Sequence, residues 1–409
     1  MTGVGALTPL GLSAPETWRG LIEGRSGIAP IERFDASALP VRIAGEVKGF
    51  DAERELGSKR ARRSARFSQL AVAAAREAVA DAGLDTGVDP DRVGVLVNSA
   101  VGGAPESERN IEALIERGPR ALSPYYVPST ISNMAACEVA IDLGAHGPVS
   151  ASALACASGT YALLEARLLI VSGEADVVIA GGADAAISAA MFAGLALMGP
   201  LSERNDAPEQ ASRPFDADRD GFVFGEGACL LVIESARHAR ERGASVYGTV
   251  AGGALTCDAF HFSAPEPSGV QAARALGLAL ARTGTQPEEL DYICAHGTGT
   301  RANDSAETKA IRTALGARAE QVPARSPKSM VGHIIGAAGA LSAIVCLLAM
   351  RDGVLPPTIN LTNPDPECDL DYVPLRARPA EVRVAAANAF GFGGQNCVVV
   401  LRAPAEPDS

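Results

Sequence analysis

Hydrophobic and polar residues alternate along the chain with two different periods. Residues 68–82 (SQLAVAAAREAVADA) repeat apolar positions at helical spacing, whereas residues 92–100 (RVGVLVNSA) form the short apolar run that is typical of a buried strand. A second such run, ADVVIAGGAD at residues 175–184, follows a long Ala- and Leu-rich segment that ends at Gly173. Helices that alternate with buried strands predict an α/β fold built from βαβ units around a mostly parallel sheet.

The same order of elements occurs twice in the chain. Residues 75–100 read as a helix, a glycine, a proline-containing turn, a strand and a loop of small residues, and residues 275–299 repeat this order at similar spacing. We therefore predict two related α/β halves that meet near residue 245. The N-terminal half spans residues 1–245 and the C-terminal half spans residues 246–409.

One apolar stretch is long enough to cross a membrane. Residues 329–350 contain no Asp, Glu, Lys or Arg, and they carry two glycines four residues apart, Gly332 and Gly336. This length and spacing satisfy the rules for a membrane span and for a helix-dimer motif. His333, Ser342 and the high alanine content favour a helix buried in the core of a soluble protein instead. We therefore expect no membrane segment.

Composition and charge exclude several classes of protein. The 409 residues are 47% hydrophobic but only 4% aromatic, with 43 glycines, so the core is expected to consist of small residues in close backbone contact. The net charge of −12 argues against a general binder of nucleic acids or anionic membranes. A D-x-D-x-D-G run at residues 216–221 lacks the acid that a calcium loop needs at its last position, which is Gly227, so we predict no metal site.

The cysteines and the N-terminus suggest a cytoplasmic protein. None of the eight cysteines lies at CxxC spacing, which disfavours a zinc ribbon or a thioredoxin-like motif. The first residues, MTGVGALTPLGL, lack the basic start and continuous apolar run of a secretory signal. We expect reduced thiols and a cytoplasmic location.

Cys156 lies in ALACASG (residues 153–159), among residues too small to cover its thiol. It precedes a helical stretch, so helix N–H groups and the helix dipole are expected to favour the thiolate. Small neighbours would let a bulky acyl group approach and would let backbone N–H groups face a developing oxyanion. The alternative is a structural cysteine buried in the core, which is common for this residue type.

His296 leads a glycine-rich loop between a strand and a helix, in LDYICAHGTGTRANDSAETKAI (residues 290–311). The loop contains GxGxxA, a variant of the dinucleotide-binding fingerprint, so an NAD-dependent oxidoreductase is an alternative that a nucleotide titration would test. Asp304 and Glu307 would crowd a pyrophosphate at the start of the helix. A histidine at this place is better suited to polar chemistry on a substrate carbonyl.

Two further glycine-rich segments carry candidate residues. PKSMVGHIIGAAGA (residues 327–340) supplies Lys328, which can pair with a buried acid such as Glu307, and His333, whose position at the start of a helix favours a neutral ring that can donate to an oxyanion. NAFGFGGQN (residues 388–396) is either a hairpin tip or a mobile loop that closes over an active site.

Taken in order, ACASGTYAL, AHGTGT, PKSMVGHIIGAAGA and NAFGFGGQN resemble the motifs of the β-ketoacyl-acyl carrier protein synthases, most closely the elongating type II enzymes. The resemblance extends over nearly the whole chain and includes SRPFDADRDGFVFGEGA. It implies a thiolase fold, in which two pseudo-symmetric halves form a five-layer αβαβα arrangement, and usually a homodimer. It also implies an acyltransferase that needs no cofactor, because the substrates are carried on the phosphopantetheine of acyl carrier protein.

The resemblance implies a role for each matching residue. Cys156 matches the nucleophile, and His296 and His333 match the pair that stabilises an enolate formed by decarboxylation of malonyl-acyl carrier protein. Lys328 and Glu307 match a supporting ion pair, with Asp304 nearby. The backbone N–H groups of Cys156 and Phe392 match the oxyanion hole, and Phe390 and Phe392 match a gate over the acyl pocket. Thr298 and Thr300 match the threonines that hold the pantetheine arm. In the basic run KRARRSAR (residues 59–66), Lys59, Arg62 and Arg63 are the expected contacts for the acidic carrier protein, although an isolated charge run is more often a solvated surface.

Two alternatives within the family remain open. Elongating fatty-acid synthases usually read HGTST-P-x-GD after the histidine, but this chain reads HGTGTRAND, which is common in polyketide-type enzymes. A type II polyketide or polyene ketosynthase is therefore an alternative to fatty-acid elongation. A non-catalytic subunit that resembles a chain-length factor is less expected, because that class typically lacks the nucleophile that Cys156 matches.

Overall fold

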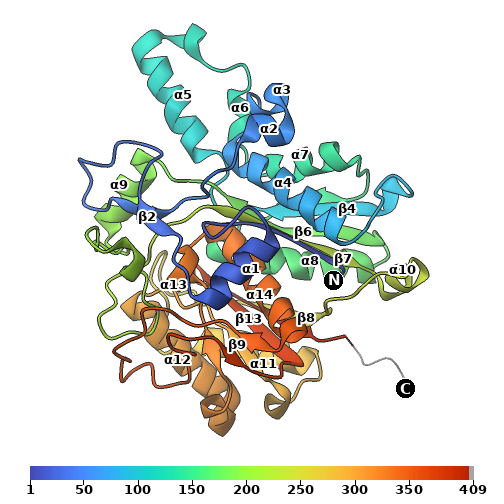
Figure 1. Cartoon of the computed structure of the whole chain (residues 1–409), viewed down its shortest axis with the longest axis vertical. Helices are drawn as coiled ribbons and strands as arrows, with labels where there is room; N and C mark the ends of the chain where they lie inside the picture. The colour runs from blue at the N-terminus through green and yellow to red at the C-terminus, as the bar shows by residue number, and fades with distance from the viewer. Residues whose placement is uncertain (405–409) are drawn as a thin grey trace.

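The computed structural model describes residues 1–404 and contains two five-stranded sheets with helices between and around them (Figure 1). In the first sheet the order is β1 (Gly3–Leu7), β7 (Gly227–Glu234), β6 (Val177–Asp184), β4 (Val93–Asn98) and β5 (Val149–Ser150). In the second sheet the order, taken from the matching end, is β8 (Thr249–Cys257), β14 (Gln395–Arg402), β13 (Val384–Gly391), β9 (Tyr292–Cys294) and β10 (Ala324–Arg325).

The two sheets share one pattern of strand directions. β4 runs parallel to β6 and β5, whereas β7 is antiparallel to both β6 and β1. Likewise β9 runs parallel to β13 and β10, whereas β14 is antiparallel to both β13 and β8. The predicted repeat is thus present as two sheets of equal topology. Four of the five strands in each sheet point the same way, as the predicted mostly parallel sheet requires, and one strand, β7 or β14, runs against them. This reversed strand was not predicted, because hydrophobic periodicity carries no information on strand direction.

Helices form three layers around the sheets. α8 (Ser158–Val171) and α14 (Ala338–Asp352) lie between the sheets and contact strands of both. α4 (Arg66–Asp81) and α7 (Met134–Leu143) cover the outer face of the first sheet, and α11 (Val270–Arg282) and α12 (Arg301–Leu315) cover the second. This is the five-layer αβαβα arrangement of the thiolase fold. The domain boundary near residue 245 stays a prediction, and residues 405–409 of the predicted C-terminal half lie outside the described residues.

The remaining elements extend from these layers. The helices are α1 (Ala14–Glu23), α2 (Ala52–Leu56), α3 (Ser58–Ala61), α5 (Ala104–Arg117), α6 (Tyr126–Thr130), α9 (Ala189–Met198), α10 (Ala236–Glu241) and α13 (Lys328–Val331). Two small two-stranded sheets pair β2 (Ile28–Pro30) with β3 (Ile43–Gly45) and β11 (Val354–Leu355) with β12 (Arg378–Pro379). In Figure 1, α5 projects from one end of the molecule, beside α2, α3 and α6.

Small residues let backbones touch across the layers, as the composition predicts. A Cβ on Gly5 of β1 would overlap the carbonyl oxygen of Ala74 in α4. A Cβ on Gly159 of α8 would overlap the carbonyl oxygen of Gly336, just before α14. The two central helices therefore meet backbone to backbone at their N-terminal ends.

The apolar segment near residue 340 is a core helix. Within residues 1–404, Ile335–Asp352 is the one helical stretch long and apolar enough to cross a membrane, with a mean hydropathy of 1.6, and 83% of it is buried inside the protein. It packs between the two sheets as part of the largest hydrophobic cluster. The predicted buried core helix is confirmed.

Candidate active site

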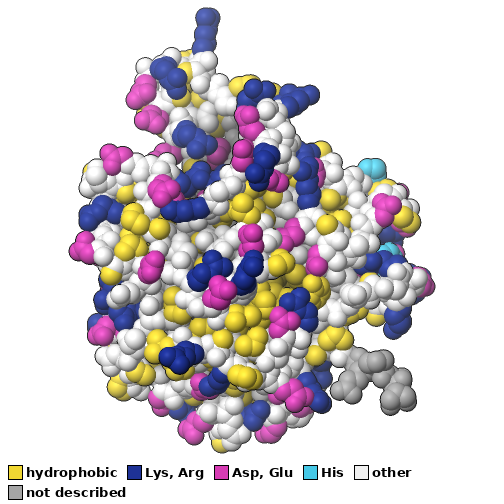
Figure 2. All heavy atoms as spheres, viewed as in Figure 1, with side chains coloured by type: hydrophobic (Ala, Val, Ile, Leu, Met, Phe, Trp, Pro, Cys, Tyr) yellow, Lys and Arg dark blue, Asp and Glu magenta, His cyan; other side chains and the backbone are white. Residues whose placement is uncertain are grey.

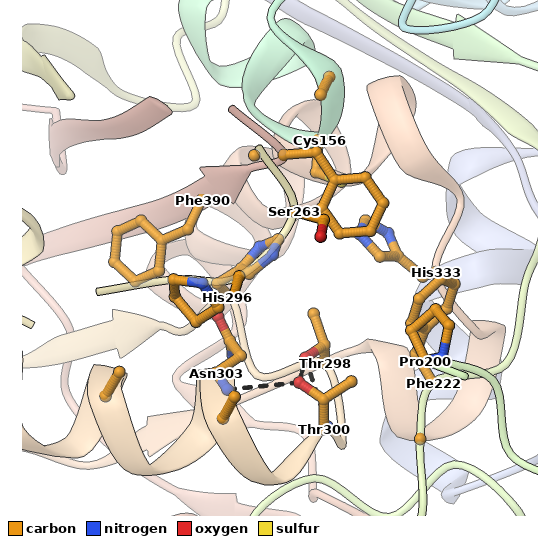
Figure 3. Close-up of a pocket in the computed structure, with 18 of the residues that line it drawn as sticks. Cys156, Pro200, Phe222, Ser263, His296, Thr298, Thr300, Asn303, His333 and Phe390 are labelled. Atoms are coloured by element: carbon orange, nitrogen blue, oxygen red, sulfur yellow. Dashed lines mark hydrogen bonds between the residues drawn. The ribbon is translucent and has the colours of Figure 1, made fainter. Parts of the chain in front are cut away.

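A cavity of about 720 Å³ lies where the N-terminal ends of the two central helices meet the glycine-rich loops (Figure 3). Cys156, His296 and His333 all line it, so the structure brings together the three residues expected to carry the chemistry. Its apolar wall also contains residues that the sequence analysis did not select: Ala100, Val101, Leu195, Phe222 and Ile335.

Cys156 sits in a strained turn directly before α8. The turn is a short 3₁₀ helix, Ala155–Ala157, and Ala155 has a φ of 47°, a left-handed conformation that an alanine adopts only at an energetic cost. A Cβ on Gly391 would lie 2.7 Å from the carbonyl oxygen of Leu154, so the end of β13 holds this turn from the other side. The thiol is thereby fixed at the cavity wall.

Burial raises the pKa of the Cys156 thiol to about 11. The positive charge of Lys328 and hydrogen bonds from the backbone N–H groups of Phe392 and of Cys156 itself lower the pKa, but by less than burial raises it. The backbone N–H groups therefore act in the predicted direction, but burial outweighs them in the resting protein, where Cys156 is only 8% exposed. The two N–H groups nevertheless converge at the sulfur, at the place predicted for an oxyanion hole.

His296 and His333 face each other across the cavity as neutral rings. Their centroids are 5.4 Å apart and the ring planes are inclined by 79°. Burial, reinforced by the nearby charge of Lys328, holds the pKa of each imidazole well below its usual range. His333 Nδ1 accepts the N–H of Ile335 at 3.2 Å, which assigns the ring proton to Nε2. This Nε2–H has no hydrogen-bond partner among residues 1–404, so it is free to donate to a substrate oxygen.

Lys328 and Glu307 hold opposite sides of the His296 backbone. Lys328 Nζ donates to the carbonyl oxygen of His296 and lies 3.4 Å from its Nδ1, which places the ring proton on Nε2. Glu307 accepts the N–H groups of His296 and Gly297, each at 2.8 Å, and an amide N–H of Asn388 at 3.1 Å. The predicted direct Lys328–Glu307 ion pair is absent from the ion pairs of residues 1–404, because the His296 peptide lies between the two side chains.

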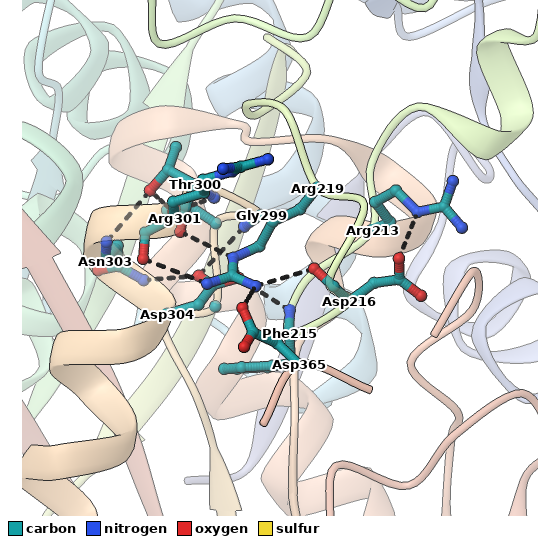
Figure 4. Close-up of polar contacts among 12 residues, drawn as sticks. Arg213, Phe215, Asp216, Arg219, Gly299, Thr300, Arg301, Asn303, Asp304 and Asp365 are labelled. Atoms are coloured by element: carbon teal, nitrogen blue, oxygen red, sulfur yellow. Dashed lines mark hydrogen bonds and ion pairs between the residues drawn. The ribbon is translucent and has the colours of Figure 1, made fainter. Parts of the chain in front are cut away.

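Asp304 supports the loop after His296 from outside the cavity (Figure 4). Its carboxylate lies 3.5 Å from Arg219 Nε and accepts the N–H groups of Phe215 at 2.8 Å and Gly299 at 3.2 Å. Arg219 is 1% exposed and also donates to the carbonyl oxygens of Thr300 and Arg301. The sequence analysis did not select Arg219. The one feature that could have indicated it is its position as an arginine inside the acidic run at residues 216–221, which resembles a calcium loop but lacks the final acid.

The threonines and phenylalanines predicted to bind or gate the substrate also line the cavity. The hydroxyl oxygens of Thr298 and Thr300 are 2.9 Å apart, and in Figure 3 they lie on the side opposite Cys156. The ring of Phe390 is 5.6 Å from that of His296. Phe392 lies in the turn that joins β13 to β14, so NAFGFGGQN is both a hairpin tip and part of the cavity wall.

The basic run lies away from this cavity. Lys59, Arg62 and Arg63 are exposed on α3 and the turn after it. They form no ion pair with the described residues, although Arg63 lies over the ring of Tyr125, whereas the neighbouring Arg60 and Arg66 are paired with Asp142 and Glu226. Figure 2 shows basic side chains gathered at the end of the molecule where Figure 1 places α2, α3 and α5. Arg62 and Arg63 line a separate polar cavity of about 690 Å³.

Asp184 is a buried carboxylate that the sequence analysis did not select. It ends β6 and accepts hydrogen bonds from the hydroxyl of Ser99 at 2.7 Å and from the N–H groups of Ala100, Val101 and Gly336 at 3.0, 3.1 and 2.7 Å. It therefore ties the cavity wall after β4 to a 3₁₀ turn, Ile335–Ala337, that precedes α14. In that turn Ile335 has a φ of 45°, close to that of Ala155 before α8. The sequence feature that could have indicated Asp184 is an acidic residue at the end of an otherwise apolar strand.

Comparison with known proteins places these features in a family. The N-terminal domain profile of the beta-ketoacyl synthases matches residues 1–239, and their C-terminal domain profile matches residues 247–362. The 3-oxoacyl-[acyl-carrier-protein] synthase 2 of Synechocystis sp. is 47% identical over 403 residues, which cover 98% of this chain and 97% of the relative.

Solved structures show the same fold. The ishigamide ketosynthase/chain length factor superposes with a TM-score of 0.92 at 38% identity, covering 99% of this chain and 98% of the other. A type II polyketide ketosynthase, bound to the hexaketide and in complex with its acyl-carrier protein, superposes with a TM-score of 0.92 at 32% identity, with coverage of 99% and 98%. The chain therefore belongs to the β-ketoacyl synthase family, as an acyltransferase of the type II ketosynthase kind.

Proposed function

We propose that the protein catalyses a decarboxylative Claisen condensation in fatty-acid chain elongation. An acyl group on Cys156 condenses with malonyl-acyl carrier protein to give 3-oxoacyl-acyl carrier protein and CO2. The observation that carries this proposal is the cavity in which one thiol, with two backbone N–H groups beside it, faces two neutral imidazoles. The 47% identity to a 3-oxoacyl-[acyl-carrier-protein] synthase 2 supports the same reaction.

The first step transfers the acyl group from the carrier thioester to Cys156. The Cys156 sulfur attacks the thioester carbonyl, and the N–H groups of Cys156 and Phe392 stabilise the negative oxygen that forms. Collapse of this intermediate breaks the bond to the phosphopantetheine sulfur, which leaves with the proton that the thiol gives up. Because burial disfavours the thiolate, the positive charge of Lys328 and these N–H donors are needed to bring ionisation within reach.

The second step uses the two imidazoles. Loss of CO2 from malonyl-acyl carrier protein leaves an electron pair that is delocalised onto the thioester oxygen as an enolate. The Nε2–H groups of His296 and His333 donate to this oxygen, as their neutral state allows. The enolate carbon then attacks the acyl carbonyl on Cys156, a carbon–carbon bond forms, and the Cys156 thiolate leaves and takes up a proton.

The surrounding residues position these groups. Lys328 and Glu307 fix His296 through its backbone, and Asp304 fixes the loop that carries Thr298 and Thr300, whose hydroxyls would hold the pantetheine arm. Phe390 and Phe392 would gate the acyl cavity. Every step uses groups of the chain or of the carried substrates, so we propose that the enzyme needs no cofactor or metal.

We further propose a cytoplasmic homodimer that docks acyl carrier protein on Lys59, Arg62 and Arg63. These three cations are exposed and form no ion pair within residues 1–404, which suits an acidic partner. For the dimer, the edge strand β5 is exposed at both residues, and apolar side chains on neighbouring helices are also exposed, with Ile141 of α7 at 70% and Val171 of α8 at 67%. An open sheet edge with apolar flanks is a surface that a second subunit can cover.

A polyketide or polyene ketosynthase is the second candidate. An apolar groove of about 800 Å³ shares Met191, Leu195 and Met198 with the reactive cavity, which gives room for a long chain. The similarity to the ishigamide ketosynthase/chain length factor points in the same direction.

The deciding experiment is intact-protein mass after incubation with acyl-carrier proteins of several chain lengths. The condensation proposal predicts a mass gain equal to the acyl group, which is absent in Cys156→Ala and discharged by malonyl-carrier protein as a 3-oxoacyl product. The chain lengths accepted separate fatty-acid elongation from the second candidate. A failure to acylate Cys156 with any donor would contradict both and would indicate a non-catalytic subunit.

A further inference from the structure

Arg301 is the one lysine or arginine among residues 1–404 that lines the reactive cavity. It belongs to HGTGTRAND, where the chain departs from the usual fatty-acid motif, and the proposed mechanism gives it no role. It is the first residue of α12, directly after Thr300, and its side chain is exposed. The carboxylates that line the cavity belong to Asp220, Asp258, Glu266 and Glu307.

The guanidinium of Arg301 has no partner within residues 1–404. It forms neither an ion pair nor a side-chain hydrogen bond there, and the acids drawn beside it in Figure 4, Asp304 and Asp365, are paired with Arg219 instead. The backbone at this place is fixed, because Arg219 donates to the carbonyl oxygens of Thr300 and Arg301, each at 3.3 Å. Arg301 therefore presents a free positive charge from an anchored backbone.

Exposure to solvent increases along the path from the thiol to Arg301. Cys156 and Thr298 are buried, Thr300 is partly exposed and Arg301 is exposed. The two threonines lie on the side of the cavity opposite Cys156 (Figure 3). A carrier-bound substrate has its thioester at the inner end of the pantetheine arm and a phosphate at the outer end. An arm that places the thioester at Cys156 and passes both threonines therefore carries its phosphate toward Arg301.

We propose that Arg301 binds the phosphate of the phosphopantetheine arm and so selects phosphorylated donors over thioesters without a phosphate. The planar guanidinium presents paired N–H donors that match phosphate oxygens, and such charge-assisted hydrogen bonds are stronger than neutral ones. Asp220, Asp258 and Glu266 would repel a phosphate placed beside them at the same cavity. Arg301 is thus a specificity residue, and the inference rests on the proposed condensation, which supplies the carrier-bound substrate.

Two acyl donors that differ only in the phosphate test this directly: an acyl-phosphopantetheine and the corresponding acyl-pantetheine. In wild type, the second-order rate constant for acylation of Cys156, followed by intact mass, should be about fivefold higher with the phosphorylated donor. Arg301→Met should abolish this preference by slowing the phosphorylated donor alone, whereas Arg301→Lys should keep part of it. Arg274→Met is the matched control, because Arg274 of α11 is also exposed and without an ion pair in residues 1–404 but does not line the cavity. It should keep the full preference.

An unchanged rate of Arg301→Met with acyl-pantetheine would show that the variant is folded and that the effect is confined to the phosphate. The wild-type preference should also shrink at high salt, because an exposed ion pair is screened. Equal rates with both donors in wild type, or a preference that persists in Arg301→Met, would overturn the inference while the condensation stands. If neither donor acylated Cys156, the proposed condensation would be contradicted, and this inference with it.

Discussion

The reactivity of Cys156 should rise steeply with pH. With a pKa raised to about 11 by burial, about one Cys156 in ten thousand is a thiolate at pH 7, whereas about one in a hundred would be ionised at the ordinary thiol value of 9.0. Alkylation requires the thiolate. The rate should therefore be about a hundredfold below that of an accessible free thiol at pH 7, and it should increase about tenfold per pH unit without levelling before about pH 10.

The assay is the rate of carbamidomethylation by iodoacetamide, followed by intact mass and by peptide mapping of Cys156, with Cys156→Ser as the control for other thiols. Lys328→Met should be slower across this range, because the charge of Lys328 lowers the Cys156 pKa. A rate that levels off between pH 7 and 9 would refute the reasoning, because it would mean that the helix N-terminus and the two N–H groups outweigh burial.

Three other outcomes follow from the structure. Asp184→Ala removes the acceptor of four donors and should lower the free energy of unfolding by about 4 kcal/mol, measured by urea denaturation; a loss under about 1 kcal/mol would contradict its bridging role. Burial raises the pKa of the Glu77 carboxyl from 4.5 to about 7. The protonated carboxyl should therefore add up to about 3 kcal/mol to the free energy of unfolding below pH 4.5, and this contribution should be lost as pH rises through 7. Glu77→Gln should flatten the dependence of unfolding free energy on pH in this range, and equal slopes for the variant and wild type would refute the reasoning. Reversing the charges of Lys59, Arg62 and Arg63 to Glu should raise KM for acyl carrier protein at least about tenfold at low salt with kcat unchanged, whereas an unaltered KM would move the docking site elsewhere.

The sequence located the reactive residues because each lies in a short motif whose composition has a local physical reason. Cys156 stands among small residues, and His296 and His333 each lead a glycine-rich segment. The repeat of helix, turn and strand likewise predicted the two halves, which are present as two sheets of equal topology.

What the sequence could not show depends on tertiary contacts. The protonation state of the Cys156 thiol is decided by its burial beneath residues from several elements. This burial outweighs the local effect of the helix that follows Cys156. Lys328 and Glu307 were assigned to each other because both are charged, but the backbone of His296 separates them. The reversed strand of each sheet was also inaccessible, because an apolar run reads the same in a parallel and an antiparallel sheet.

The two strained turns at the N-terminal ends of α8 and α14 have a consequence for how such a site can arise. Each is a 3₁₀ turn whose first residue, Ala155 or Ile335, has a left-handed φ, and each occupies the same place in its own half. A duplicated half would supply two equivalent turns face to face, and only the side chains beside them need to diverge. One copy carries a nucleophile and the other an imidazole, so a symmetric scaffold provides two unlike chemical functions in one cavity.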